Sequence, residues 1–492
     1  MCVSHIYMLE LTRQDPSPFL DKNEDPKSWP SSRKWLFTLV VACYGLVSPM
    51  AAAMVVPALR DMARDLHMMD DGQQQMLMSV FVLGWGLGPL VMGPLSEVYG
   101  RVLLLNAGHS FFLLTNTLCA FVRDKRQFII LRLLSGFFGS GPLSLGAGVL
   151  SDLWTQDERG LSLAVYTVMP LIGPAIGPIA AAYITQRWPW PWIFHASSAF
   201  AAITLLFGLV SLQETYRPIL LRRKLSGSGL TAIKSNVSLR TNLVRPFILL
   251  GTQPIIQIIA LFMAYLFGLN HLTISTFQAM WQEMYDQSPS RSSLNYLSVT
   301  TGFVVGCEVA GPLNDKVRKR IDYEYSTHIF LTPYALQQIY AHLKKIKKSP
   351  GIPEFRTALM VPAAILVPIG QLWYGWTAQA QLHWLLPNAG IAVYCFGLIV
   401  GYQCIQSYVL DCYPVYAASA VAALTLPRSL TGFAFPVFAP ALYRALGYGW
   451  TSVVLAAVTL VVGCSAPPLL RAYGPALRAR SRFAAGDVGG GV

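Results

Sequence analysis

The sequence predicts an all-α membrane protein with twelve transmembrane helices in two pseudo-symmetric halves of six. Three observations predict it. The 492-residue chain is 54% hydrophobic and only 12% charged, whereas a soluble domain carries about a quarter charged residues. Its apolar runs reach the roughly 20 residues that a helix needs to cross a bilayer, which excludes the alternating pattern of a membrane β-barrel. Finally, one short motif recurs at equivalent positions of the two halves.

Twelve apolar segments supply the predicted helices, because only a helix satisfies every backbone polar group within a single span. The spans are expected near residues 35–56, 76–95, 102–122, 127–150, 161–184, 191–211, 247–270, 294–313, 357–377, 384–410, 417–442 and 451–470. The chain then divides into an N-terminal segment, an N-terminal half, a central loop, a C-terminal half with one long loop, and a tail. Their bounds are 1–34, 35–211, 212–246, 247–470 (loop 314–356) and 471–492.

Lysine and arginine residues predict the orientation, because cytoplasmic loops of membrane proteins carry an excess of them. With twelve spans, both long gaps and both termini lie on one side. These parts hold Arg217, Arg222, Arg223, Lys224, Lys234, Arg240 and Arg245, then Lys316, Arg318, Lys319, Arg320, Lys344, Lys345, Lys347, Lys348 and Arg356, and finally Arg471, Arg478, Arg480 and Arg482. We expect this side to be cytoplasmic, and the net charge of +13 to reflect topology rather than nucleic-acid binding.

The recurring motif reads GPLSEVYGR at residues 93–101 and GPLNDKVRKR at residues 311–320, after the second and the eighth span. Spans two and eight are equivalent positions in two six-helix halves. Parallel halves of this kind are a transporter architecture, with the substrate site between them near the bilayer midplane. The sequence therefore predicts a transporter.

The first copy of the motif resembles the loop between helices two and three of the major facilitator superfamily. That pattern is a glycine, an acid four residues on, and then glycine-arginine. The residues that carry it here are Gly93, Glu97, Gly100 and Arg101, with Gly311 and Asp315 in the second copy. The resemblance implies a gating loop in which Gly93 admits a neighbouring helix and Glu97 pairs with Arg101 as a latch. The family usually has Asp at the position of Glu97, and the alternative is a helix-ending turn with solvated charges.

Span four contains an arginine within an apolar run. Arg132 would cost about 2.5–3.5 kcal/mol in mid-helix on insertion scales, so it needs a partner or a use. Ser135, Gly136 and Gly139 follow at three, four and seven residues and share its face of the helix. The pattern resembles the fourth helix of the superfamily, which is associated with proton coupling. The alternative is a structural arginine that caps backbone carbonyls of a neighbouring helix.

Span five contains PLIGPAIGPIAAAYI, in which Gly173-Pro174 and Gly177-Pro178 repeat a glycine-proline step. Prolines inside a membrane helix kink it, and glycines allow tight packing. This repeat resembles the signature of the drug:proton antiporters within the superfamily, and it is the most specific functional signal in the chain. The alternative is a generic kinked packing helix.

The C-terminal stretch YVLDCYPVYAASAVAALTLPRSLTGFAFPVFAPALYRALGYGW, and ETYRPILLRRK after span six, resemble the twelve-span drug:proton antiporters of fungi. The resemblance extends over about residues 25–475. Two departures, Gln253 in span seven and Leu424 in span eleven, replace polar or ionisable groups of the family near the translocation path. Arg428 in span eleven and Glu308 in span eight join Arg132 as proton-coupling candidates. Glu308 and Arg428 could equally form a structural salt bridge.

By the same resemblance, spans one, four, seven and ten line the substrate cavity. Besides Arg132, the candidate lining residues are Tyr44, Gln257, Tyr265, Asn270, Tyr394, Tyr402, Gln403 and Gln406. A wide cavity with aromatic side chains and few charges suits amphipathic organic molecules better than sugars or inorganic ions. We therefore predict proton-coupled efflux of drugs, toxins or secondary metabolites, and the alternative is a proton-coupled importer of a nutrient or polyamine.

No enzyme, cofactor or metal is predicted. The histidines are scattered, no nucleophile or metal-ligand cluster occurs, and no P-loop pattern supports an ATP-driven pump. The expected partners are a small-molecule substrate, protons and the lipid bilayer, for a chain that is expected to be monomeric. We expect a multi-pass protein of the plasma membrane, with the vacuolar membrane as the alternative. Residues 321–338 interrupt an otherwise compact basic loop, and we interpret them as a retained intron or an insertion.

Overall fold

The structure is a computed structural model of the 492-residue chain. It describes residues 25–68, 70–155, 158–227, 239–319, 357–413, 416–479, 481 and 483–484, and side chains are described for most of these. The stretch 321–338, the predicted insertion, lies outside the described residues.

The described chain is built from helices. The N-terminal half comprises η1 (Pro26–Ser28), α2 (Ser31–Ala53), η2 (Val56–Ala58), α3 (Leu59–Asp65), α4 (Asp71–Tyr99), α5 (Arg101–Leu118), η3 (Cys119–Phe121), α6 (Lys125–Gly139), α7 (Gly141–Leu153), α8 (Arg159–Thr185) and α9 (Pro191–Ser211). The remainder comprises α10 (Arg217–Gly227), α11 (Leu239–Thr252), α12 (Pro254–Tyr285), α13 (Pro289–Leu294), α14 (Tyr296–Lys319), α16 (Thr357–Gln379), α17 (Leu385–Cys412) and α18 (Ala417–Ala479).

These helices make twelve membrane crossings. Nine helical segments of the described chain are long and apolar enough to cross a bilayer, and α6 and α7 together form one of them. Another, α18, contains a break at Gly447, where φ is 71°, so it supplies two crossings. Helices α14 and α16, with 24 and 23 residues, complete the twelve. The predicted all-α fold of twelve helices is confirmed.

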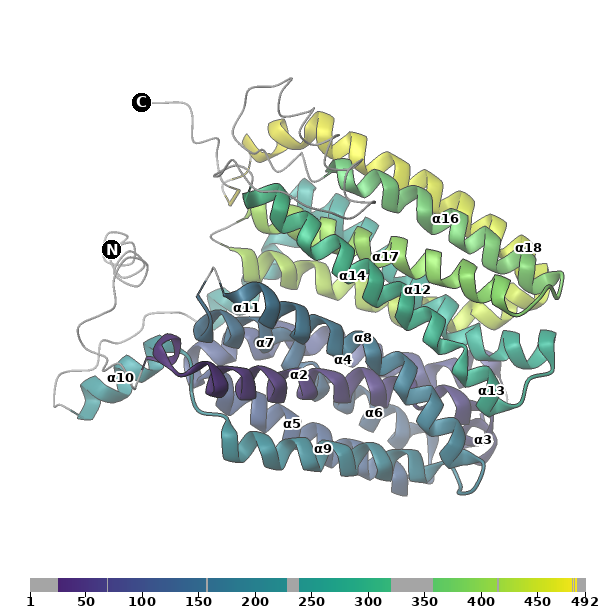
Figure 1. The fold of residues 1–492 in the computed structure, drawn as a ribbon, viewed down its shortest axis with the longest axis horizontal. Helices are drawn as coiled ribbons and strands as arrows, with labels where there is room; N and C mark the ends of the chain where they lie inside the picture. The colour runs from purple at the N-terminus through teal and green to yellow at the C-terminus, as the bar shows by residue number, and fades with distance from the viewer. Residues whose placement is uncertain are drawn as a thin grey trace.

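The helices form two halves that lie side by side (Figure 1). Helices α2 to α9 make the N-terminal half, and α12, α14, α16, α17 and α18 make the C-terminal half. Between the halves, α4 packs against α18 and α8 packs against α14.

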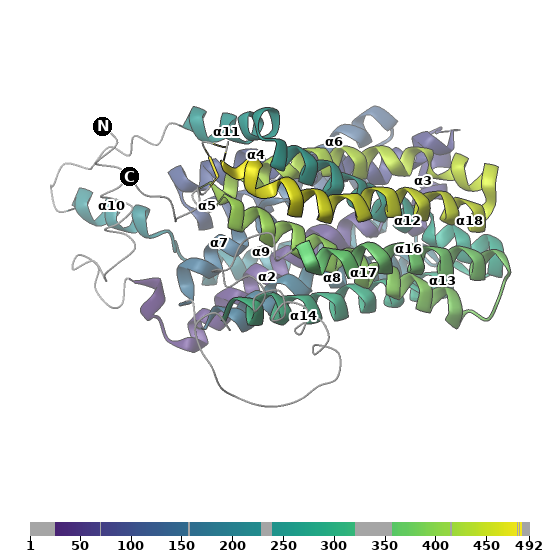
Figure 2. The same cartoon turned by 90° about the horizontal axis from the view of Figure 1, so that it is seen from above.

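The two ends of the bundle are distinct and need names. We call the end where α4 meets α5 the Arg101 end, and the end where α3 joins α2 to α4 the Arg60 end. Helix α10 projects beyond the bundle at the Arg101 end, whereas α3 and α13 lie at the opposite end (Figures 1 and 2).

Glycines set the closest contacts inside each half, because helices in lipid associate through van der Waals packing of small residues. A Cβ at Gly84 of α4 would lie 2.0 Å from the carbonyl oxygen of Leu133, and one at Gly136 of α6 would lie 2.0 Å from that of Phe81. The two glycines therefore hold α4 and α6 in direct backbone contact from both sides.

Candidate functional site

The segment GPLSEVYGR forms the sharp turn between α4 and α5. Gly100 adopts φ 110° and ψ 150°, a conformation that L side chains rarely adopt. A Cβ at this position would also lie 2.3 Å from Oε2 of Glu214. Glycine is thus required for two reasons: the positive φ of the backbone, and the space that the Glu214 carboxylate occupies.

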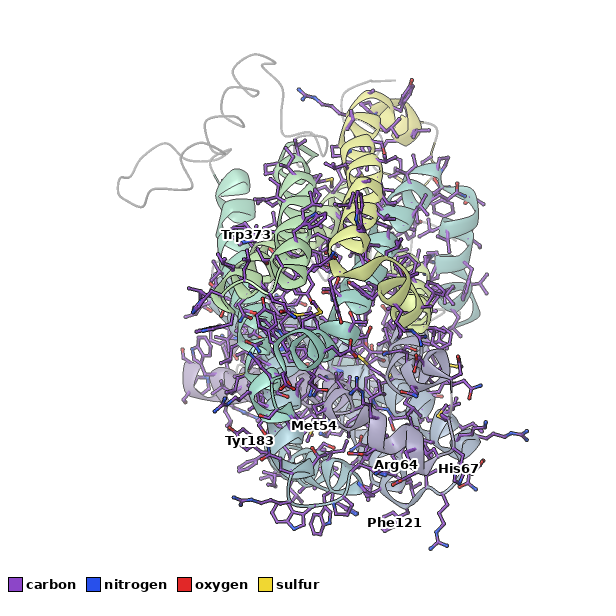
Figure 3. The ribbon with its side chains drawn as sticks, turned by 90° about the vertical axis from the view of Figure 1, so that its right-hand side faces the viewer. Met54, Arg64, His67, Phe121, Tyr183 and Trp373 are labelled. Atoms are coloured by element: carbon purple, nitrogen blue, oxygen red, sulfur yellow. The ribbon has the colours of Figure 1, made fainter. Side chains whose placement is uncertain are left out.

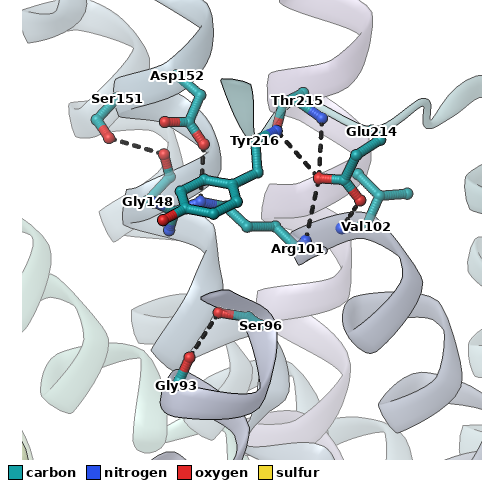
Figure 4. A network of polar contacts seen from close by, with 10 residues as sticks. All are labelled: Gly93, Ser96, Arg101, Val102, Gly148, Ser151, Asp152, Glu214, Thr215 and Tyr216. Carbon is teal, nitrogen blue, oxygen red and sulfur yellow. Dashed lines mark hydrogen bonds and ion pairs between the residues drawn. The ribbon is translucent and has the colours of Figure 1, made fainter. Parts of the chain in front are cut away.

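Arg101 forms an ion pair inside the N-terminal half (Figure 4). Its Nε lies 2.7 Å from Oδ2 of Asp152 in α7, and the two side chains are only 20% and 18% exposed. Gly148, one turn earlier, makes room, since a Cβ there would lie 1.6 Å from Nη1 of Arg101. The guanidinium also lies 5.0 Å from the ring centre of Tyr216. Because the pair is largely shielded from water, the attraction between its charges is less screened than in an exposed pair, and removing one partner would leave a shielded charge unpaired.

Glu214, just after α9, ties this end of the half together (Figure 4). Its Oε1 accepts hydrogen bonds from the backbone N–H groups of Arg101, Thr215 and Tyr216, at 3.1, 3.1 and 3.0 Å. Its Oε2 accepts from the N–H of Val102 at 3.3 Å. The first N–H groups of a helix lack intrahelical partners and favour a negative charge, so Glu214 caps α5. Burial and the nearby carboxylate of Glu97 raise the pKa of Tyr216, which stays neutral.

The ion pair at this turn differs from the predicted latch between Glu97 and Arg101. The ion pair of Arg101 is made with Asp152, while Glu97 lies in electrostatic contact with both Arg101 and Arg245 of α11. Among the described residues, no atom of a neighbouring helix lies within 4 Å of a Cβ built at Gly93, so none of them makes the close approach expected there. Its carbonyl accepts a hydrogen bond from the Ser96 hydroxyl at 2.7 Å. In the second copy of the motif, Gly311 and Asp315 are helical, and their side chains lie outside the described ones.

Sequence reasoning missed Asp152, Glu214 and Gly148 as parts of this site. The segment ETYR after α9 was a signal, because it belongs to the pattern shared with the fungal antiporters. Nothing local in the sequence pairs Asp152 with Arg101.

Arg132 is fully enclosed in the N-terminal half. The residue is 0% exposed, and its three guanidinium nitrogens have no hydrogen-bond acceptor in the described part of the chain. The guanidinium carbon lies 4.5 Å from the ring centre of Phe81 in α4 and 5.7 Å from that of Phe194 in α9. The guanidinium of Arg132 therefore lies between two aromatic rings. It donates to no described backbone carbonyl, which argues against the alternative of an arginine that caps a neighbouring helix.

The small residues that share the face of Arg132 pack against three helices. The Ser135 hydroxyl donates to Oγ1 of Thr115 in α5 at 3.0 Å. Gly136 contacts the backbone of α4, and a Cβ at Gly139 would lie 2.7 Å from Oγ of Ser48 in α2. This face of α6 points into the half, which encloses Arg132.

The glycine-proline repeat of α8 lies against α2. A Cβ at Gly173 would lie 2.9 Å from the backbone nitrogen of Met50, and one at Gly177 would lie 2.5 Å from its carbonyl oxygen. The same helix contacts the other half, because Oγ1 of Thr300 in α14 donates to the Leu171 carbonyl at 3.5 Å. Helix α8 thus touches both halves at the level of its repeat.

Three expected cavity residues lie inside a half instead. Tyr44 is 0% exposed, donates to Oδ1 of Asn106 at 2.9 Å and stacks on His109 at 4.0 Å. Tyr394 is 0% exposed and accepts from Oγ1 of Thr273. The hydroxyl of Tyr265 donates to the Leu455 carbonyl at 2.9 Å. Each hydroxyl finds a partner on a neighbouring helix, which is how buried tyrosines usually satisfy their polar tip.

Of the other five expected cavity residues, two donate a hydrogen bond to a neighbouring helix, and three differ in their burial. Gln257 caps the end of α11, since its Nε2 donates to the carbonyls of Leu250 and Gly251 at 3.0 and 3.1 Å. Gln403 donates to Sγ of Cys307 at 3.0 Å. The remaining three are Asn270, which is buried, Tyr402, which is partly buried, and Gln406, which is exposed.

Arg428 of α18 lies among aromatic side chains of the C-terminal half. Its guanidinium carbon lies 5.1 Å from the ring centre of Phe267. Among the described residues no ion pair joins it to Glu308, whose side chain is exposed on α14. The structural salt bridge between these two residues, one of the alternatives, is therefore absent in this conformation.

At the Arg60 end, polar contacts cross from one half to the other. Arg60 of α3 lies 2.9 Å from Oε1 of Glu283 in α12, and the Tyr448 hydroxyl donates to Oε2 of the same carboxylate at 3.4 Å. Arg444 of α18 lies 2.8 Å from Oδ2 of Asp71 in α4. Figure 3 looks onto this end of the bundle. None of these residues was predicted as a site.

One further hydrogen bond joins the two halves at the Arg60 end. Nε2 of Gln186, at the end of α8, donates to Oγ of Ser290 in α13. In this conformation the two halves are thus bonded to each other at the Arg60 end.

Comparison with known proteins agrees with this architecture. The family profile of the Major Facilitator Superfamily matches residues 41–436. The chain is 50% identical over 480 residues to the MFS-type transporter oryF of Aspergillus oryzae, over 95% of each chain. It is 37% identical to the efflux pump vrtL of Penicillium aethiopicum, over 94% of this chain and 90% of that one. It is 30% identical to the efflux pump radE of Floropilus chiversii, over 94% and 84%.

Solved structures share the fold at low identity. The proton:xylose symporter XylE superposes with a TM-score of 0.63 at 14% identity, over 90% of this chain and 96% of that one. The human organic anion transporter MFSD10 superposes with a TM-score of 0.57 at 17% identity, over 89% and 100%. At these identities the similarity establishes the fold alone.

Proposed function

The chain belongs to the major facilitator superfamily, and on that premise we propose that it exports small amphipathic organic molecules in exchange for protons. The proposed substrates are drugs, toxins or secondary metabolites. The observation that carries the proposal is the glycine-proline repeat of α8, which lies against Met50 of α2 on a helix that also contacts α14. A helix that touches both halves can transmit their relative motion. Two of the relatives described above bear the name efflux pump, which supports the same direction of transport.

The proposed orientation puts the Arg101 end in the cytoplasm, following the excess of Lys and Arg in the loops on that side. The contacts between the halves at the Arg60 end would then close the pathway on the outside. The plasma membrane is the proposed location, with the vacuolar membrane as the alternative, and export from the cytoplasm has the same orientation in both.

For the proton-coupling role we propose Arg132 first. A guanidinium that is enclosed and lacks an acceptor is costly in a membrane interior, so approach of an anionic group or water is favoured there. The exposed carboxyl of Glu308 and the partly buried Arg428 are the other candidates. At the Arg101 end, we propose that the contact between Glu97 of α4 and Arg245 of α11 acts as the gate. The Arg101–Asp152 pair joins two helices of one half and is proposed to keep that half rigid.

The experiment is proton-driven flux in inverted vesicles or proteoliposomes. The vesicles carry the full-length chain, and uptake of lipophilic compounds is compared with and without an imposed pH gradient. We expect uptake in the export direction that stops when the gradient collapses and is strongly reduced in Arg132→Ala. The matched control is Arg471→Ala, an exposed arginine of α18, which should leave flux unchanged.

Two results would contradict the proposal. Export that persists without a gradient would exclude proton coupling. Accumulation in the opposite direction would favour the alternative, a proton-coupled importer of a nutrient or polyamine.

A further inference from the structure

A cluster of polar and aromatic side chains lies where α12, α17 and α18 meet, and the mechanism above leaves most of it unused. We call it the Arg428 cluster: Phe267 and His271 from α12, Tyr402 from α17, and Arg428 and Ser429 from α18. The ring centres of Phe267 and His271 lie 4.3 Å apart, and those of Phe267 and Tyr402 lie 6.3 Å apart. Both His271 and Tyr402 lie in electrostatic contact with Arg428.

The cluster lies deep in the bilayer. Tyr402 precedes the end of α17 at Cys412 by ten residues (412 − 402), and Arg428 follows the start of α18 at Ala417 by eleven (428 − 417). At 1.5 Å per residue, both lie roughly 15 Å from the Arg101 end of their helices. The substrate site of a transporter with parallel halves is expected near this depth.

Several polar atoms of the cluster are buried and have no hydrogen-bond partner among the described residues. They are Nε of Arg428, the hydroxyl of Tyr402 and Oγ of Ser429. No carboxylate in the described chain forms an ion pair with Arg428. A buried cation without a counter-ion is destabilising, and unpaired hydroxyls beside it add to the cost. A bound anion would supply a counter-ion for Arg428 and an acceptor for the Tyr402 hydroxyl.

The cluster borders the other half of the molecule. A Cβ at Gly86 of α4 would lie 2.0 Å from Oγ of Ser429, and one at Gly432 would lie 3.0 Å from Val82. Arg428 and Tyr402 are only partly buried, and Gln406, one turn further along α17, is exposed. Polar side chains that remain exposed within a membrane span face the bundle interior or water rather than lipid. The cluster is therefore placed at the boundary between the halves.

We infer that the Arg428 cluster binds the carboxylate of an acidic amphipathic substrate. Arg428 and the hydroxyl of Tyr402 donate to the carboxylate oxygens, and Phe267 contacts the apolar body of the molecule. The inference rests on the proposed export function and names the substrate class within it, an organic acid with an apolar ring system. A polyamine is disfavoured, because Arg428 would repel its cationic groups.

The test compares two ligands that differ in charge and share one ring. Purified full-length protein in lipid nanodiscs is titrated with naphthalene-1-acetic acid and with naphthalene-1-acetamide, and binding is measured by calorimetry. We expect the acid to bind about ten-fold more tightly than the amide, because charge-assisted hydrogen bonds are the stronger ones. Further acid–amide pairs with one and three rings extend the comparison to other apolar bodies.

Variants assign the preference to the cluster. Arg428→Gln should remove the preference by weakening the acid about ten-fold while the amide changes less than two-fold. Arg428→Lys, which retains charge and loses the planar fork, should fall between. Tyr402→Phe should weaken the acid about three-fold. Arg471→Gln, an exposed arginine of the same helix, is the control and should bind both ligands as the parent does.

Two results would overturn the inference: equal or weaker binding of the acid in every pair, or an acid preference that survives Arg428→Gln. If Arg428→Gln does not fold, judged by size-exclusion, an unchanged preference in Tyr402→Phe overturns it instead. Proton-driven export of the amides with no preference for the acids would overturn this inference alone. Acid-selective binding without proton-driven flux would support it and contradict the proposed function.

Discussion

The two ends of the bundle hold their ion pairs in opposite ways. At the Arg101 end, Arg101 and Asp152 belong to one half and are about four-fifths shielded. At the Arg60 end, Arg60 and Glu283 belong to different halves and are 68% and 52% exposed. A shielded pair is strong and costly to break, whereas an exposed pair contributes about 0–1 kcal/mol.

The difference shows which contacts can change during transport. A half that moves as a rigid body needs strong internal contacts, and halves that separate need weak mutual ones. The Arg101–Asp152 pair and the cap of Glu214 meet the first requirement. The exposed pairs at the Arg60 end meet the second, and four substitutions test this division.

Loss of Asp152 has the largest expected effect. Asp152→Asn leaves Arg101 shielded and without its carboxylate, so we expect a loss of about 3 kcal/mol in the free energy of unfolding. Chemical denaturation in detergent micelles measures it. A loss under about 1 kcal/mol would show that this pair behaves like an exposed one.

The turn at Gly100 is the next test. Gly100→Ala places a Cβ against the Glu214 carboxylate in a backbone conformation with positive φ, so we expect a loss of about 2 kcal/mol. Gly93→Ala is the matched control. A Cβ there meets no described atom of a neighbouring helix within 4 Å, and alanine favours the helix by up to about 1 kcal/mol. Equal effects at both glycines would refute the steric argument.

The cap of α5 should contribute less. Glu214→Gln keeps the size of the side chain and removes the charge that faces four N–H groups, so a loss of about 1 kcal/mol is expected. The same denaturation experiment applies. Raising the salt concentration should change the difference little if the carboxylate acts at short range, as the 3.0 to 3.3 Å distances indicate.

The smallest effect on stability is expected at the Arg60 end. Glu283→Gln should change the free energy of unfolding by less than about 0.5 kcal/mol and yet favour opening of this end about two-fold. Opening is measured as the labelling rate of a cysteine introduced by Ser290→Cys, with a membrane-impermeant maleimide. A large loss of stability with no change in labelling would reverse the comparison between the ends.

The sequence predicted the helices and the turn well, because long apolar runs and a GPLSEVYGR motif are local signals. It did not predict that Asp152 and Glu214 meet Arg101, since these residues lie at or just beyond the ends of three different helices. It also assigned Tyr44 and Tyr265 to the substrate cavity, whereas both hydroxyls donate to neighbouring helices of their own half. In a helix that is apolar on all sides, periodicity does not distinguish the face toward a cavity from the face toward a neighbouring helix.

The break at Gly447 has a consequence for handling the protein. At that residue the chain reverses within the run of α18, with no intervening loop. The other described connections at the Arg60 end are also short, such as residues 186–190 and 380–384. This face offers little extended chain to a protease or an antibody, so we expect epitope tags to be tolerated better at the opposite end.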